Sequence, residues 1–346
     1  MSTSHAGTSS PGTGIFVINK ARILVVVSLI LTWTFASLIP KYKQTVIDIS
    51  RETYNDAIEH LPAVKVDWHP KYDPKSQFNA SKVALMIEAR PIPHLVPQIL
   101  HMISVVPPDW RFMFIGSNKS VISVSRSFAT QYQEANGKLD LVVLPKPWSI
   151  DSKEDVYRLL TDLRFYDELL PEVEWLLKFE SDSIMCARSD DSLNDWLHYS
   201  WAGAPRSATD RFAGNGGLSL RRISAIRQIL NFQARYNDTE PEDEWFGKRL
   251  TVLPGAKVAN GQQEDHFSVE AIYHEKPMGY HVRDGGETLS DDVWRDPARR
   301  KSNFEYCPEL AMIMPMKLER ERCEGDNRQG EILGQENKDE EKRARI

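Results

Sequence analysis

The chain has 346 residues, of which 41% are hydrophobic and 27% are charged, an ordinary balance for a globular protein with a large core. A formal net charge of −6 without any basic stripe argues against nucleic acid as a partner. Three cysteines are too few for a disulfide framework and lack the paired spacing of a zinc site, so they allow one disulfide whose pairing stays open.

The first distinctive segment is residues 23–39, which contain no charged residue and are bordered by Arg22 and Lys41. Its length is at the short end of what crosses a bilayer. We interpret residues 23–40 as a transmembrane anchor. A buried core helix is the first alternative, but the Ser/Thr/Gly-rich residues 1–14 would leave it little to pack against. A cleaved signal peptide is the second, but no A-x-A-like cleavage site follows.

The anchor implies a topology for the chain. Basic residues flank it on both sides, so charge does not decide the orientation. A short first anchor with a short tail usually leaves the bulk of the chain in the lumen. We therefore expect a single-pass type II protein of the Golgi or ER membrane, with residues 1–22 in the cytosol and residues 41–81 as a stem. Three N-x-S/T sequons agree with a luminal body, and they begin at Asn79, Asn118 and Asn237.

The folded body is expected over residues 82–316, and its first half alternates compact apolar runs with segments of helical spacing. The apolar runs are typical of buried parallel strands. This alternation predicts an α/β fold with a mostly parallel sheet flanked by helices. The expected strands lie within residues 82–90, 110–117, 139–145 and 175–179, and the expected helices within 93–107, 120–133 and 152–170.

The second half of the body is less regular. Residues 214–230 predict a Gly-rich turn followed by a helix, and residues 241–250 predict the start of another helix. Residues 266–282 are interpreted as a closing strand segment. Residues 317–346 carry dense charge of both signs and few apolar residues, which predicts a solvated tail, either disordered or a lone helix.

Two carboxylates, Glu180 and Asp182, follow the fourth expected strand. In open α/β sheets, ligands bind outside the carboxyl ends of the strands. Carboxylates on alternate residues of an extended segment point the same way, and such a pair can hold a divalent cation with waters and phosphates. The alternative is that Asp182 and Ser183 cap a turn.

A glycine-rich block over residues 214–217 precedes two arginines. Gly216 and Gly217 permit positive φ and a close approach of the backbone to a ligand, and Arg221 can meet a phosphate, so these three are candidate nucleotide-binding residues. The alternatives are a tight turn without a ligand and arginines that begin a solvated helix face. The block is neither a G-x-G-x-x-G sequence after a strand nor a P-loop.

An acidic block, EPEDEWF, covers residues 240–246. A carboxylate held beside Trp245 and Phe246 can have a pKa near neutral and act as a general base. The alternative is an acidic first helical turn favoured by the helix dipole. Further on, His281 can ligate a metal or lie on the surface.

Five blocks in chain order carry a resemblance to a known family: ESD at a strand end, WAGAP, GNGGLSLRR, PEDEWF and GYH. Together they resemble the fungal family of DUF5672 domains, which is similar to GT-A-type glycosyltransferases. The resemblance covers about residues 82–281 and implies a GT-A-like (Rossmann-like) fold. It also implies a D-x-D-like metal element, here Glu180-Ser181-Asp182 with Glu as the first carboxylate, for Mn²⁺ or Mg²⁺.

The resemblance further assigns roles to later residues. Glu242 and Asp243 match the place of an acceptor base, so both are candidate catalytic residues. His281 matches a further metal ligand, and Arg90 falls where the nucleotide is usually held.

The predicted activity follows from the chemistry of nucleotide sugars. Cleaving such a donor leaves negative charge on a diphosphate, which a divalent ion or arginines stabilise. An acceptor hydroxyl needs a carboxylate to take its proton if the reaction inverts the anomeric centre. We therefore expect a glycosyltransferase that moves a sugar from a nucleotide sugar to a glycan or glycoprotein. The alternatives are a non-catalytic carbohydrate-binding or scaffold protein with this fold and a metal-dependent phosphoesterase, for which the chain offers few clustered His and Asp ligands.

Overall fold

The computed structural model describes residues 20–60, 72–210, 212, 214–283 and 288–314. The chain divides into two compact units, Met1–His69 and Pro70–Ile346, which are described separately. The charged tail predicted at residues 317–346 lies outside the described residues, as does most of the predicted N-terminal tail.

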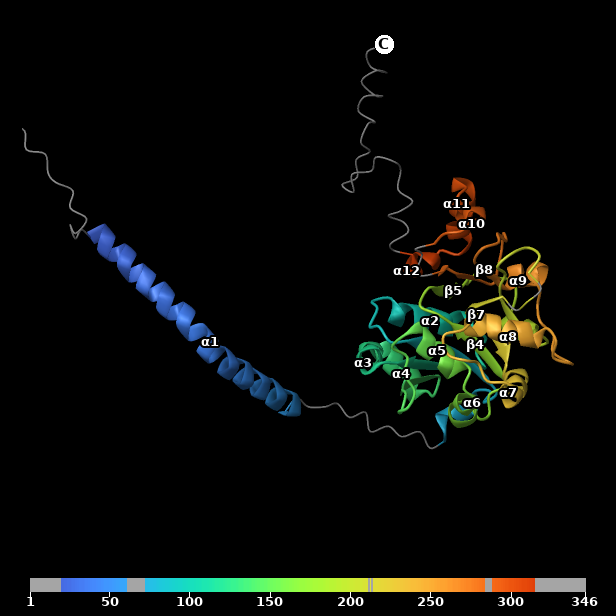
Figure 1. Ribbon diagram of the computed structural model, residues 1–346, viewed down its shortest axis with the longest axis horizontal. Coiled ribbons are helices and arrows are strands. Elements are labelled where there is room, and N and C mark those ends of the chain that lie inside the picture. Colours follow the sequence, from blue (N-terminus) through green and yellow to red (C-terminus); the bar gives the residue numbers. More distant parts are fainter. Residues whose placement is uncertain (1–19, 61–71, 211, 213, 284–287, 315–346) are drawn as a thin grey trace, which may run out of the picture. The chain divides into compact units, whose positions relative to one another are not determined.

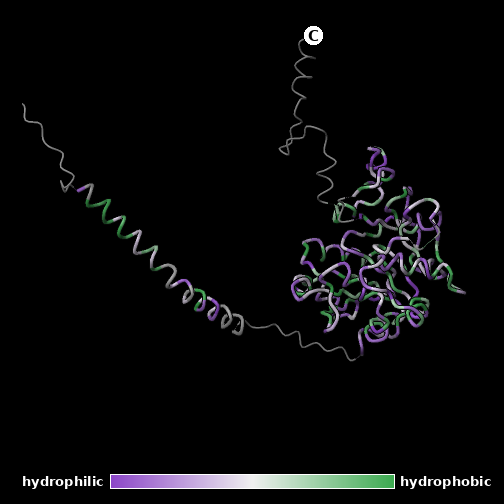
Figure 2. The backbone as a smooth tube through the Cα atoms, in the orientation of Figure 1, coloured by the Kyte–Doolittle hydropathy of each residue, from purple (hydrophilic) through white to green (hydrophobic). Residues whose placement is uncertain are grey.

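The described part of the first unit is helix α1 (Lys20–His60), whose apolar residues gather in its first half (Figure 2). This helix covers the predicted anchor and continues into the predicted stem. Among the described residues, however, no helix combines the length and the apolar character needed to cross a membrane. The transmembrane helix predicted at residues 23–40 is therefore not found.

The second unit is built around a six-stranded sheet with the strand order β3-β2-β1-β4-β7-β6 (Figure 1). Strands β1 to β4 run parallel to one another, whereas β7 runs antiparallel to both β4 and β6. The predicted α/β fold with a mostly parallel sheet is thus confirmed, and all four predicted runs are strands. The strands are β1 (Lys82–Glu88), β2 (Arg111–Gly116), β3 (Leu139–Val143), β4 (Trp175–Phe179), β6 (Trp201–Ala204) and β7 (Asn215–Arg222).

Both faces of this sheet are buried, as expected for parallel strands covered by helices. Alternate side chains of β1 point to opposite faces, so Ala84 and Met86 join one core and Val83 and Leu85 join the other. The first core includes residues of α2 (Leu95–Val105), α3 (Asn118–Ser125) and α9 (Gly261–Phe267), with α4 (Phe128–Ala135) packed on α2 and α3. The second includes residues of α5 (Lys153–Leu160), α6 (Leu163–Leu169), α7 (Ile223–Phe232) and α8 (Glu242–Leu250).

Two predicted helices are each divided in the structure. The segment 120–133 becomes α3 and α4, and the segment 152–170 becomes α5 and α6. Asp162 explains the second break, because its carboxylate accepts the Arg164 N–H as the N-cap of α6. Hydrophobic spacing cannot show such a break, since α5 and α6 both bury their apolar residues in the same core.

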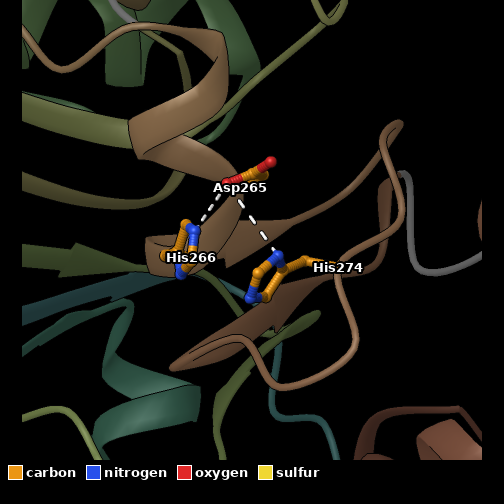
Figure 3. A group of neighbouring side chains, drawn as sticks. All are labelled: Asp265, His266 and His274. Carbon is orange, nitrogen blue, oxygen red and sulfur yellow. Dashed lines mark ion pairs between the residues drawn. The ribbon is translucent and has the colours of Figure 1, made fainter.

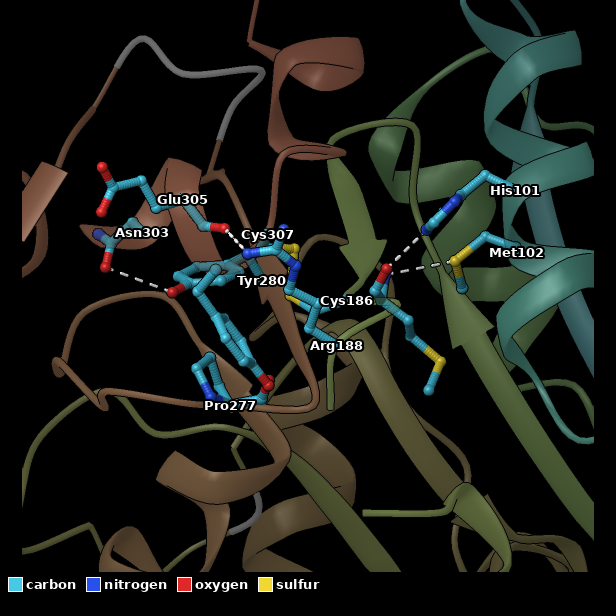
Figure 4. Close-up of a disulfide and its surroundings, with 11 residues drawn as sticks. His101, Met102, Cys186, Arg188, Pro277, Tyr280, Asn303, Glu305 and Cys307 are labelled. Atoms are coloured by element: carbon cyan, nitrogen blue, oxygen red, sulfur yellow. Dashed lines mark hydrogen bonds between the residues drawn. A yellow bond between two sulfur atoms is a disulfide. The ribbon is translucent and has the colours of Figure 1, made fainter. Parts of the chain in front are cut away.

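A second, three-stranded sheet has the order β5-β9-β8 and comprises β5 (Ser183–Met185), β8 (Ser268–Val269) and β9 (Gly279–His281). Its core contains the disulfide Cys186–Cys307, with Cα atoms 5.1 Å apart, so the pairing left open by the sequence is resolved (Figure 4). The His101 ring forms a hydrogen bond of 2.7 Å with the Met185 carbonyl, which links α2 to β5. The remaining elements are η1 (Pro74–Gln77), η2 (Leu193–Trp196), α10 (Asp291–Trp294), α11 (Pro297–Tyr306) and α12 (Leu310–Ile313).

Candidate functional site

The junction between the two sheets brings the predicted metal ligands together. Residues 180–182 link the end of β4 to the start of β5. Strand β9 pairs antiparallel with β5, so that Ser183 lies opposite His281, and the Val282 N–H donates to the Asp182 carbonyl at 2.8 Å. The pairing of two short strands therefore sets His281 beside Asp182, although the two residues are far apart in the chain.

Glu180, Asp182 and His281 each offer a ligand atom, and these atoms lie within 4.8 Å of one another. His281 Nε2 is 3.5 Å from Asp182 Oδ1 and 3.8 Å from Glu180 Oε2. The other ring nitrogen, Nδ1, is 3.0 Å from Glu270 Oε2. A carboxylate on the far nitrogen is the usual orienting partner of a metal-binding histidine. The three residues thus fit a divalent cation, and a set of two carboxylates and one imidazole favours Mn²⁺ over Mg²⁺.

Without a metal, His281 is buried among carboxylates. Burial lowers the pKa of its imidazole, but hydrogen bonds and charges from Asp182 and Glu270 outweigh burial and raise the pKa to about 10. The ring packs against Gly217, where a Cβ atom would lie 2.2 Å from Nε2. The backbone of the glycine block is thus closely approached, as predicted, but the group that approaches it here is the His281 side chain of the same protein.

The glycine block itself differs from the prediction. Residues 215–222 form strand β7 instead of a turn. Residues 218–222 pair with β4, Asn215 pairs with Ala204 of β6, and the Glu180 N–H donates to the Gly217 carbonyl at 2.9 Å. The glycines of the block do not use the positive φ that they permit: Gly137 and Gly255 are the glycines with positive φ in the described part of the chain. The predicted helix follows directly as α7.

Arg221, predicted to meet a phosphate, is fully buried. Its guanidinium lies 4.2 Å from the centre of the Trp201 ring and donates to Glu242 Oε1 at 2.7 Å. The side chain does not line the cavity described below. In this structure Arg221 is a partner of Glu242 inside the protein, because β7 is a central strand whose residues 216–221 are all buried.

Glu242 and Asp243 begin α8, as the sequence predicted, and both line the cavity. Burial raises the pKa of Glu242, but Arg221 and Lys178 outweigh it and hold that pKa below its usual range. Burial and the neighbouring charge of Glu242 raise the pKa of Asp243. Asp243 Oδ2 accepts hydrogen bonds of 2.8 Å from the Gly216 N–H and from Arg206. Two adjacent carboxylates with pKa shifts of opposite direction suit different roles, an ionised anchor and a general base.

Three residues of the site escaped the sequence analysis: Lys178, Arg206 and Glu270. Lys178 is buried in β4 and donates to Glu180 Oε1 and, at 3.0 Å, to the Gly216 carbonyl. A lysine inside an otherwise apolar strand, WLLKF, is itself a signal, since lysine is almost never buried without a partner. No comparable signal marks Arg206 or Glu270.

These side chains line one cavity of about 780 Å³, a size typical of ligand sites. Arg90 lies at its edge, where its exposed guanidinium makes hydrogen bonds of 2.8 and 2.7 Å to Glu88. The cavity thus combines carboxylates that can hold a cation with basic groups that can hold phosphates. Its basic lining residues are Arg90, Lys153, Lys178, Arg206 and Arg283.

The structure has an α/β fold with a mostly parallel central sheet flanked by helices. Residues 138–281 match the family described as "Protein of unknown function (DUF5672)". This match falls within the resemblance predicted over about residues 82–281 and covers its later part. None of the curated proteins matches the chain.

Several solved glycosyltransferase structures are similar to the chain. The mannosyltransferase PcManGT from Pyrobaculum calidifontis, in complex with GDP-Man and Mn²⁺, shows 12% identity over 57% of this chain and 58% of its own, with a TM-score of 0.37. The apo form of the glycosyltransferase GlyE from Streptococcus pneumoniae TIGR4 shows 13% identity over 69% and 64%, with a TM-score of 0.39. The mannosyltransferase Ktr4p from S. cerevisiae shows 9% identity over 54% and 66%, with a TM-score of 0.30. The chain spans less than two thirds of the length of each, and at these low scores the function must be inferred from the site itself.

Proposed function

We propose that the second unit is a metal-dependent glycosyltransferase that moves a sugar from a nucleotide sugar to a hydroxyl group of a glycan or glycoprotein. The observation that carries this proposal is the convergence of Glu180, Asp182 and His281 within 4.8 Å, in a cavity that also contains basic groups and a candidate base. A site at the carboxyl end of a central strand is where α/β sheets bind ligands.

On the donor side, the chain supplies both metal ligands and phosphate ligands. A divalent ion bound by Asp182, Glu180 and His281 would neutralise charge on the diphosphate of the donor. Lys178 fixes the Glu180 carboxylate by a hydrogen bond, and Glu270 fixes the ring of His281. The basic residues at the cavity wall bind the phosphates and hold the leaving nucleotide.

On the acceptor side, Asp243 is the better of the two predicted bases. Its pKa is raised by burial and by Glu242, which favours proton uptake from a hydroxyl group. Glu242 is held ionised by Arg221 and is already committed to that ion pair. In an inverting reaction, Asp243 takes the proton of the acceptor, while the buried Glu242–Arg221 pair keeps the start of α8 in place.

We also propose that this unit works in the lumen of the Golgi or ER, as expected from the sequence. The Cys186–Cys307 disulfide supports an oxidising compartment. The three sequon asparagines, Asn79, Asn118 and Asn237, are all exposed, which supports their use as glycan acceptors.

The test is nucleotide release by the purified full-length protein, measured with a panel of nucleotide sugars and acceptors in the presence of Mn²⁺, Mg²⁺ or EDTA. We expect release with Mn²⁺, its loss in EDTA, and a drop of about 100-fold in Asp182→Asn. Asp190→Asn is the matched control, because Asp190 is exposed and does not line the cavity.

Two results would contradict the proposal. Nucleotide release that is unchanged in Asp182→Asn would remove the metal site from the reaction. Binding of Mn²⁺ and a nucleotide without turnover of any donor would indicate the non-catalytic carbohydrate-binding alternative.

A further inference from the structure

A second cluster of metal-ligating side chains lies outside the cavity, at the C-terminal turn of α9 (Figure 3). Asp265 and His266 belong to α9, and His274 belongs to the connection between β8 and β9. Each offers one ligand atom, and these atoms lie within 4.8 Å of one another. Two imidazoles and a carboxylate therefore converge on one point from two separate segments.

The shared point of the cluster is Asp265 Oδ1. His266 Nε2 lies 3.6 Å from it and His274 Nδ1 lies 3.9 Å from it, as the dashed lines of Figure 3 mark. Both distances are too long for hydrogen bonds. Oδ1 is nevertheless buried, and it accepts no hydrogen bond from the part of the chain that the structure describes. A buried carboxylate oxygen without a hydrogen-bond partner destabilises the folded protein, and a bound cation would relieve this.

The two imidazole rings also favour a shared cation. Their centres are only 3.9 Å apart, with an angle of 47° between the ring planes. Two protonated imidazoles at this separation would repel each other, whereas two neutral imidazoles can donate lone pairs to the same ion.

The spacing and the donor atoms indicate which ion fits. Tetrahedral Zn²⁺ with nitrogen and oxygen ligands at about 2.0–2.2 Å places neighbouring ligand atoms about 3.3–3.6 Å apart. The observed 3.6 and 3.9 Å therefore need only small side-chain rotations. Two imidazoles favour Zn²⁺ over Mg²⁺ or Ca²⁺. The half-exposed side chain of His266 leaves access for the ion and for a water at the fourth position.

We propose that Asp265, His266 and His274 form a Zn²⁺ site distinct from the Glu180–Asp182–His281 site. The bound ion joins α9 to the connection between β8 and β9. That connection already bonds to α9 through the Met278 N–H and the His266 carbonyl, at 2.8 Å. Since Glu270 begins the connection and His281 closes β9 beyond it, the ion restrains a segment that supplies two residues of the cavity. The proposal stands whether or not the cavity transfers sugars.

The experiment is a Zn²⁺ titration of the metal-stripped full-length protein by calorimetry, together with Co²⁺ as a spectroscopic probe. We compare the wild type with His266→Ala/His274→Ala, with Asp182→Asn and with His198→Ala, an exposed histidine outside both clusters. The double variant is expected to lose one equivalent of Zn²⁺, or at least about 100-fold in affinity for it, together with the visible Co²⁺ bands of a nitrogen-containing site. Asp182→Asn and His198→Ala should keep that equivalent and those bands.

Two outcomes would overturn the proposal. The first is a double variant that binds Zn²⁺ as the wild type does, and the second is an Asp182→Asn variant that binds no Zn²⁺. Circular dichroism and the thermal midpoint in EDTA show whether each variant is folded. Because the two histidines make no hydrogen bond to Asp265, the double variant should unfold in EDTA at nearly the wild-type temperature. Added Zn²⁺ should raise the midpoint of the wild type and of His198→Ala by more than that of the double variant, which keeps only the Glu180–Asp182–His281 site.

Discussion

At the scale of single residues, Gly217 decides where His281 can lie. The imidazole occupies the volume that any side chain at position 217 would need. Its far nitrogen is fixed by Glu270, so the ring cannot turn away without losing that bond. The sequence suggests that Gly217 belongs to a turn. In the structure its lack of a side chain leaves the space that the imidazole of His281 occupies.

We predict that Gly217→Ala weakens Mn²⁺ binding by about 10- to 100-fold, because the added methyl group displaces the ring of His281. Overpacking of this kind should also lower the free energy of unfolding by about 1–3 kcal/mol. Calorimetric titration with Mn²⁺ and chemical denaturation measure the two effects. In a His281→Ala background the same substitution should cost little stability, and a cost that stays the same there would contradict the steric explanation.

Glu242 and Asp243 are adjacent, yet we predict that replacing each carboxylate by an amide affects stability in one case and turnover in the other. Glu242→Gln leaves the fully buried Arg221 without a counter-charge and should lower the free energy of unfolding by about 3–5 kcal/mol. Asp243→Asn keeps an oxygen that can accept the Gly216 N–H, so it should stay folded and lose about 100-fold in turnover. Denaturation curves and nucleotide release separate the two. Full turnover in Asp243→Asn would show that another group takes the proton.

The candidate metal ligands were predictable from single residues, but their surroundings were not. Glu180 and Asp182 follow a recognisable strand, and His281 came from the family resemblance. Glu270 becomes relevant only through the folding of β8 beside β9, which no local pattern encodes. Arg221 shows the reverse case. An arginine next to a glycine block suggested a phosphate ligand, whereas its position on a central strand that is buried on both faces puts it in the interior.

At the scale of elements, one ion pair joins α5 to the segment before α8. Arg235 donates to both carboxylate oxygens of Glu154, at 2.9 and 2.7 Å, and the Asp238 N–H donates to the same carboxylate at 3.0 Å. The hydrogen bonds from Arg235 are the main reason why the pKa of Glu154 falls from 4.5 to about 2. The first turn of α5 and the start of α8 both line the cavity, so this pair links two segments of the cavity wall.

We predict that Glu154→Gln lowers the free energy of unfolding by about 2 kcal/mol at pH 7, because hydrogen bonds to charged groups are lost. The folded-state pKa lies below the unfolded value, so the pair stabilises the protein above pH 4.5 and loses its contribution as the pH falls towards 2. Denaturation at several pH values should show the difference between wild type and variant shrinking over that window.

The matched control is Glu168→Gln, which breaks the exposed pair with Arg164 within α6. Its effect on the free energy of unfolding should be close to zero at every pH, because solvent screens this exposed pair. An equal effect of the two substitutions would mean that the partly buried Glu154–Arg235 pair contributes no more than a surface pair.

At the scale of the whole molecule, the four parallel strands of the large sheet were predictable, whereas β6, β7 and the pairing of the strands in the small sheet were not. Four apolar runs with helices between them specify a parallel sheet, because burial on both faces leaves a continuous apolar signature. Strands β5, β8 and β9 have only two or three residues each, which is too short for any periodicity. The candidate site lies where these two sheets meet, so the sequence indicated its residues without indicating how they come together.

The disulfide offers a test of how far the small sheet governs the site. Cys186 directly follows β5, and its bond to Cys307 closes a loop with a sequence separation of 121. A loop of this length should make the bond worth about 3–5 kcal/mol of unfolding free energy. The disulfide also fixes the end of the strand whose pairing with β9 sets Asp182 beside His281.

We therefore predict that reduction of the disulfide, or the substitution Cys186→Ser, lowers the affinity for Mn²⁺ as well as the free energy of unfolding. Calorimetry and denaturation with and without dithiothreitol measure both effects, and the reduced wild type should match the Cys186→Ser variant. Loss of stability with unchanged Mn²⁺ affinity would show that the pairing of β5 with β9 holds the ligands without help from the disulfide.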